Sequence, residues 1–136
     1  MRNGVHKTRN LRSVWTITTK PYRGAHFAVM ASELAEQCIR AGTSEAGCCS
    51  QCFTPYKQIV NDNVSSLETT CGHSTTDQRV PSIVLDPFAG AFTTGIVAMK
   101  LGRFGVGIEL KSEYIELSKK RIEESLSVNL ENKNVM

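Results

Sequence analysis

Regularly spaced hydrophobic residues are concentrated in the C-terminal half of this chain. A short apolar run predicts a buried strand over Ser82–Leu85, and a second run predicts a strand over Phe104–Glu109. Between them, Thr93–Leu101 is long and apolar enough to predict a helix. Ser112–Leu126 repeats apolar residues at helical spacing and predicts an amphipathic helix. This order of strand, helix, strand and helix is typical of a parallel α/β sheet.

The N-terminal part predicts one strand and one short helix. Ser13–Thr18 alternates apolar and polar residues and is rich in β-branched side chains, which predicts a strand. Ser32–Ala41 carries apolar pairs four residues apart, which predicts a helix capped by Ser32 and stopped by Gly42. Cys38 falls on the predicted apolar face, so we expect it to be a small core residue.

Composition and length indicate a single globular domain or a piece of one. The chain has 136 residues, of which 40% are hydrophobic and 21% are charged. Its 16 Lys and Arg less 13 Asp and Glu leave a net charge of +3, which permits a nucleic-acid partner without indicating one. No apolar run approaches the about 18 residues of a membrane span. Residues 13–20 are too polar for a signal-peptide core, so a cytoplasmic protein is expected.

A cluster of cysteines lies in the least regular part of the chain, residues 43–80. A structureless loop of that length needs something to hold it together. Cys49-Ser50-Gln51-Cys52 is followed after 18 residues by Cys71-Gly72-His73, close to the spacing of paired zinc knuckles. The spacing predicts a structural zinc site with the ligands Cys49, Cys52, Cys71 and His73. Cys48 is a spare ligand if the register shifts, and free cytosolic thiols are the alternative.

The turn between the first predicted strand and its helix carries the candidate binding chemistry. It reads Asp86-Pro87-Phe88-Ala89-Gly90, and glycine lets the backbone approach a ligand beside the N–H groups of a helix N-terminus. Glu109 follows Gly90 by 19 residues and ends the next strand. In dinucleotide-type folds, an acidic side chain at that place hydrogen-bonds ribose hydroxyls. Gly-x-Gly-x-x-Gly is absent, so nicotinamide binding is weakly supported, and the lack of Gly-Lys-Ser/Thr excludes a P-loop.

These motifs resemble the S-adenosylmethionine-binding segment of the DNA amino-methyltransferases, which methylate the exocyclic amino group of adenine or cytosine. The resemblance is carried by Ile83–Gly90, by Thr93-Thr94-Gly95 and by Gly107-Ile108-Glu109-Leu110. Upstream, residues 9–15 and 24–28 are similar to the stretch before the first cofactor motif in the subgroup whose cofactor motifs come last. The resemblance covers residues 9–125.

The resemblance implies an α/β, partial Rossmann-like methyltransferase fold with a cysteine-rich zinc-knuckle insertion. By the same match, the residues of the cofactor pocket are Phe27, Asp86, Phe88, Ala89, Gly90 and Glu109. Two alternatives stay open, in which Asp86 only caps its turn and Phe27 belongs to the core. Phe92 stands where the family turn has its second glycine. If that position requires a positive φ, Phe92 costs roughly 1–3 kcal/mol, and the cofactor affinity becomes the open question.

The catalytic tetrapeptide of this family, Asp/Asn/Ser-Pro-Pro-Tyr/Phe, has no match in the sequence. Lys20-Pro21-Tyr22 and Thr54-Pro55-Tyr56 each contain one proline and no preceding acid. The chain is therefore interpreted as the C-terminal part of a longer enzyme, without catalytic residues and inactive alone. Its predicted segments are a strand and helix (1–42), the insertion (43–80), the cofactor-binding βαβα unit (81–126) and a fraying tail (127–136).

This interpretation implies DNA as the partner of the complete enzyme. Three alternatives stay open for the chain itself: one subunit of a split methyltransferase, whose partner chain carries the catalytic half, a truncated remnant, or a fragment of a broken reading frame. The rival hypothesis is a zinc-stapled DNA- or protein-binding remnant with no functional cofactor site, and Phe92 motivates it. A small-molecule or RNA methyltransferase is a weaker alternative, because too few residues follow Glu109.

Overall fold

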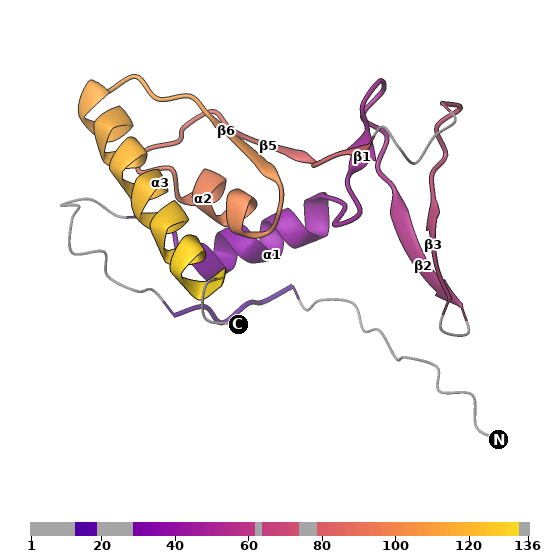
Figure 1. The fold of residues 1–136 in the computed structure, drawn as a ribbon. Coiled ribbons are helices and arrows are strands. Elements are labelled where there is room, and N and C mark those ends of the chain that lie inside the picture. Colours follow the sequence, from indigo (N-terminus) through magenta and orange to yellow (C-terminus); the bar gives the residue numbers. More distant parts are fainter. Residues whose placement is uncertain (1–12, 19–28, 62–63, 74–78, 134–136) are drawn as a thin grey trace.

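The computed structural model describes residues 13–18, 29–61, 64–73 and 79–133 (Figure 1). The elements in chain order are α1 (Ser32–Gly42), β1 (Cys48–Cys49), β2 (Lys57–Asn61), β3 (Val64–Glu68), β4 (Arg79–Val80), β5 (Ile83–Asp86), α2 (Thr93–Lys100), β6 (Phe104–Gly107) and α3 (Ser112–Lys133). Among the described helices, none is long and apolar enough to cross a membrane.

The predicted strand–helix–strand–helix unit is present. β5 and β6 pair in parallel, from Ile83 opposite Phe104 to Asp86 opposite Gly107. Helix α2 connects them, packs on both strands and also contacts α1 and α3 (Figure 1). The chain is thus a mixed helix and strand protein, compatible with the α/β class that its sequence predicts.

Helix α2 lies at the centre of the hydrophobic core. Ala35 and Ile39 of α1 pack against Val97 and Ala98 of α2, and Val84 of β5 adds to this cluster. A second cluster joins Ala89, Phe92 and Ile96, with Ile122 of α3 packed against them. Because α2 contacts elements on several sides, it is apolar almost all round rather than amphipathic.

The other face of the β5–β6 pair is exposed, which corrects the expectation of a buried strand. Alternate side chains on this face are between 45% and 59% exposed, namely Ile83, Leu85, Phe104, Val106 and Ile108. Parallel strands are normally covered on both faces. Among the described helices, α2 is the one that packs on this pair. We call these five side chains the apolar sheet face.

Three further predictions are wrong. Ser13–Thr18 is not a strand, because it pairs with no other described segment, and Val14 is 80% exposed. In α1, Cys38 is exposed, because the face that packs on α2 is the one carrying Ala35 and Ile39. The tail predicted from residue 127 instead continues α3 to Lys133.

The ends of α1 also differ from the prediction. Ser32 is its first helical residue, and the cap position belongs to Ala31, which makes no side-chain capping bond. The stop is Thr43 rather than Gly42, because the Thr43 N–H and hydroxyl both donate to the carbonyl of Ile39, at 2.9 and 2.6 Å.

The insertion contains more regular structure than expected. β1 pairs with β4 in antiparallel fashion, with Cys48 opposite Val80 and Cys49 opposite Arg79. β2 and β3 form a hairpin that extends away from the helices in Figure 1. A hairpin of two strands is marginally stable by itself in water, so it needs support at its base. Between β1 and β2, Tyr56 is buried there and its N–H donates to the carbonyl of Gly47 at 2.9 Å.

Candidate functional site

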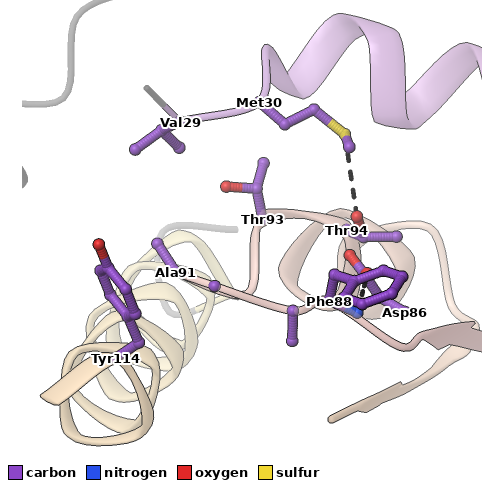
Figure 2. Close-up of a pocket in the computed structure, with 10 residues that line it drawn as sticks. Val29, Met30, Asp86, Phe88, Ala91, Thr93, Thr94 and Tyr114 are labelled. Carbon is purple, nitrogen blue, oxygen red and sulfur yellow. Dashed lines mark hydrogen bonds between the residues drawn. The ribbon is translucent and has the colours of Figure 1, made fainter. Parts of the chain in front are cut away.

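A cavity of about 280 Å³ lies over the turn that joins β5 to α2 (Figure 2). Four of the residues that the sequence predicted together line it, namely Asp86, Phe88, Ala89 and Gly90. Val29 and Met30, which precede α1, face the turn from the opposite side, and Tyr114 of α3 stands at one end (Figure 2). Ligand sites in open parallel sheets lie at this carboxyl end of the strands.

Asp86 both lines the cavity and caps its own turn. Its Oδ1 accepts a hydrogen bond from the N–H of Phe88 at 3.0 Å. Asp86 therefore caps its turn, as the alternative interpretation proposed, and it also forms part of the cavity wall. Phe88 is 89% exposed, so its ring forms an open wall of the cavity rather than a part of the core.

Glu109 comes to the same turn from the end of β6. Its Oε2 accepts a hydrogen bond from the N–H of Gly90 at 2.9 Å, while Oε1 accepts from the N–H groups of Leu110 and Lys111, both at 2.9 Å. Gly90 has a φ of 50°, which glycine adopts without strain. Glu109 does not line the first cavity. It lines a neighbouring cavity of about 420 Å³ between β6 and α3, together with Ile115.

The backbone donors around Glu109 make the stability of the fold depend on pH. The hydrogen bond from Lys111, with those from Gly90 and Leu110, lowers the pKa of the Glu109 carboxyl below its usual value. A lowered folded-state pKa stabilises the fold fully above the unfolded pKa of about 4.3, and this stabilisation is lost as the pH falls through the folded value.

We therefore expect Glu109→Gln to lower the free energy of unfolding at pH 6. The deficit relative to the natural chain should shrink as the pH falls below about 4.3. Urea denaturation of both chains between pH 3 and 7 measures this difference. Glu123→Gln, at an exposed position of α3, is the matched control. A deficit that does not change with pH would contradict the assignment.

Phe92 has a positive φ, the condition under which its place in the turn carries a backbone cost. Its φ of 59° and ψ of 33° are left-handed, a region that favours glycine. The side chain is nevertheless buried, and its ring lies against Gly95 and Gly107. A Cβ at Gly95 would lie 2.1 Å from the ring, so the absence of side chains at both glycines makes room for it. Phe92 lines the second cavity and not the one over the turn.

Two residues of α3 contact the turn and were missed by the sequence analysis. Ser118 Oγ lies 2.9 Å from the carbonyl oxygen of Gly90. Arg121 donates from Nη1 to the carbonyl of Ala91 and, at 3.1 Å, to Oγ1 of Thr93. The available signal was two polar residues three apart between the apolar positions of a helix, which places them on one face.

The four predicted metal ligands come together in the insertion. The ligand atoms of Cys49, Cys52, Cys71 and His73 all lie within 4.8 Å of one another, and Cys49 Sγ is 3.9 Å from His73 Nδ1. In a tetrahedral site with zinc–sulfur bonds of about 2.3 Å, two sulfur atoms are about 3.8 Å apart. Cys48 is outside this group, because its buried thiol points to the carbonyls of Val80 and Pro81.

Local geometry around Cys52 favours the form of cysteine that binds metal. Phe53, with a φ of 56°, closes a tight turn in which its N–H donates to the carbonyl of Cys49 at 2.9 Å. Hydrogen bonds from the hydroxyl and backbone of Thr54 lower the pKa of the Cys52 thiol to about 6. A thiolate is the ligand form of cysteine.

Phe27, the remaining predicted site residue, lies outside the described residues.

Taken together, the chain combines a parallel βαβ unit with a cavity at the glycine turn after its first strand, an arrangement compatible with an α/β protein. The family model described as DNA methylase matches residues 2–120. The chain therefore belongs to the DNA methylase family of the adenine-N6 and cytosine-N4 type.

Individual relatives agree with this assignment. The chain is 36% identical over 114 residues to the type II methyltransferase M.SmaI of Serratia marcescens, covering 84% of this chain and 27% of the relative. It is 32% identical over 115 residues to M.Cfr9I of Citrobacter freundii, with 85% and 27% covered. The DNA adenine methyltransferase YhdJ of Escherichia coli is 58% identical over 41 residues, with 30% and 14% covered.

The chain spans about a quarter of the length of the first two relatives. No solved structure gives a significant match.

Proposed function

We propose that this chain forms the S-adenosylmethionine-binding portion of a site-specific DNA methyltransferase that acts on the exocyclic amino group of adenine or cytosine. The observation that carries the proposal is the cavity at the carboxyl end of β5, lined by four of the six residues that the family resemblance assigns. Membership of the DNA methylase family supports it.

The residues around the turn fit the groups of this cofactor. The carboxylate of Asp86 suits the cationic methionine end, and the exposed ring of Phe88 offers an apolar wall. Each oxygen of Glu109 already accepts backbone N–H groups, but a carboxylate has about four lone-pair sites, so it can accept a ribose hydroxyl as well. When bound, S-adenosylmethionine supplies the methyl group. The chain's residues hold and orient it.

Calorimetry with S-adenosylmethionine tests the proposal on the 136-residue chain. We expect a micromolar dissociation constant, weakened about tenfold or more in Asp86→Asn. Asparagine keeps an acceptor for the Phe88 N–H, so the turn survives while the charge is lost. Glu123→Ala on α3 is the control. A folded chain that gives no heat, binds zinc and retains DNA would instead support the rival zinc-stapled module.

We further propose that a partner carrying the catalytic tetrapeptide completes the enzyme by packing on the apolar sheet face. The five exposed side chains of that face support this, because contiguous exposed apolar surface marks interaction sites. The isolated chain is expected to transfer no methyl group to DNA of varied sequence, since the tetrapeptide is absent from its sequence. Clear methylated product from the isolated chain would overturn the proposal that a partner supplies the catalytic tetrapeptide.

The cysteine–histidine cluster is proposed as a structural zinc site. Three sulfur atoms and one nitrogen within 4.8 Å of one another fit a four-coordinate ion. Four protein ligands leave no open position for a reacting water, so the ion would hold the insertion together. Its ligands precede β2 and follow β3 in the chain, at the open end of the hairpin where Lys57 pairs with Glu68 and support is needed.

A further inference from the structure

We infer that Arg121, assisted by Ser118, is a positioning residue that holds the cofactor turn in its binding conformation from α3. The inference rests on the proposed function, since it names residues that prepare the same cavity. Neither residue touches the cavity itself. Both act through backbone and side-chain groups of the turn.

The Gly90 peptide is held from two different elements. Its N–H donates to Glu109 at the end of β6, at 2.9 Å, and its carbonyl lies 2.9 Å from the hydroxyl of Ser118 on α3. The Ser118 hydroxyl also lies 2.7 Å from the carbonyl of Tyr114 in its own helix. A hydroxyl has one proton, so the two carbonyls compete for it and Ser118 is the weaker contact.

Arg121 makes the stronger contact one step further along the turn. Its Nη1 carries two protons, and it donates to the carbonyl of Ala91 and to the hydroxyl oxygen of Thr93. Thr93 is 5% exposed and lines the cavity, where Figure 2 shows its side chain between Val29 and Ala91. Arg121 thus fixes a main-chain carbonyl and a cavity-lining side chain with one charged group.

This contact matters because the last residue of the turn has a costly backbone conformation. Phe92 occupies the cap position of α2 in a left-handed conformation and supplies no side-chain cap. The cost of such a backbone must be met by surrounding contacts. The ring of Phe92 secures the side towards β6, and Arg121 secures the side towards the cavity.

Two measurements on the 136-residue chain test this role. In Arg121→Ala we expect the dissociation constant for S-adenosylmethionine to rise about tenfold, with a partial recovery in Arg121→Lys. We also expect amide hydrogen exchange at Gly90 and Phe92 to accelerate about tenfold without ligand, while the β6 amide of Phe104 stays unchanged. Ser118→Ala should show a smaller effect of the same kind. Lys120→Ala, exposed on α3, is the control.

The two readouts separate the possible failures. If the natural chain binds no S-adenosylmethionine but Arg121→Ala still loosens the turn amides selectively, the proposed function fails and the positioning role stands. If the cofactor binds and Arg121→Ala changes neither affinity nor exchange at the turn, the positioning role is refuted. If exchange accelerates equally at Gly90 and Phe104, Arg121 has only a general structural role, which also refutes it.

Discussion

Replacing Cys49 with serine is expected to abolish stoichiometric zinc binding and to unfold the insertion over residues 43–80. Cys49 is the buried ligand of the cluster and belongs to β1, which pairs with β4. Structural zinc sites contribute about 10–16 kcal/mol of apparent binding free energy in small peptides at pH 7, and this energy is largely folding energy. Loss of one thiolate should therefore release the hairpin as well as the ion.

Zinc content by mass spectrometry and amide exchange over β2 and β3 measure this outcome. The natural chain should hold one zinc ion per molecule, and a chelator should reproduce the effect of Cys49→Ser. Cys38→Ser is the matched control, because Cys38 is an exposed cysteine on α1 outside the cluster. A natural chain that purifies and refolds equally well without zinc would show that these are free thiols.

The second large effect is expected at Gly105, where strand β6 meets helix α2. A Cβ at this position would lie 2.7 Å from the Cα of Gly95 and 2.9 Å from its carbonyl oxygen. Both are backbone atoms, so helix and strand must separate to admit a methyl group. We expect Gly105→Ala to lower the free energy of unfolding by about 1–3 kcal/mol, the usual cost of overpacking.

Urea denaturation measures the loss of stability in Gly105→Ala, with the same substitution at a glycine that has free space around it as the control. Gly42→Ala is the control, because nothing lies within 4 Å of its added Cβ at the end of α1. It should leave the stability unchanged or raise it slightly. Equal stability of Gly105→Ala and the natural chain would mean that α2 does not rest on β6 as described.

The same contact gives a double-mutant test of Phe92. Gly95→Ala should destabilise the natural chain, because its Cβ meets the Phe92 ring at 2.1 Å. In a Phe92→Ala background that clash is removed, so the additional cost of Gly95→Ala should nearly vanish. Additive costs in the two backgrounds, measured by urea denaturation, would show that the ring does not occupy this space.

How far the sequence predicts the fold depends on how local the determining forces are. α2, β5 and β6 were predicted because strong apolar runs and the intervening turn specify them within a few residues. Exposure was not predictable in the same way. Leu85 reads as core by composition, yet it lies on a sheet face that no described element covers.

The sequence predicted neither the buried face of α1 nor the β2–β3 hairpin. Cys38 and Ile39 are neighbours in an amphipathic segment, and only the packing of α2 against α1 decides that Ile39 is buried and Cys38 is not. The β2–β3 hairpin was missed, because its strands Lys57–Asn61 and Val64–Glu68 lie in a polar segment where the apolar alternation typical of a strand is weak.

The candidate sites were predicted in unequal measure. The four residues of the cysteine–histidine cluster were indicated by spacing alone, since two residues on each tight turn can point to a common centre. At the turn between β5 and α2, the sequence indicated Asp86, Gly90 and Glu109. For Arg121 it offered only a polar position on a helix face, because that residue reaches the turn only after α3 has packed beside α2.

The most direct test of the central claim is a nuclear magnetic resonance titration of the isotope-labelled chain with S-adenosylmethionine. We expect saturable shift changes at the amides of Phe88, Gly90, Thr93 and Glu109. The β2–β3 hairpin should be unaffected, and Asp86→Asn should weaken the response. A titration that leaves the amides of the turn unchanged, or that shifts only residues elsewhere in the chain, would contradict the assignment of this turn as the cofactor site.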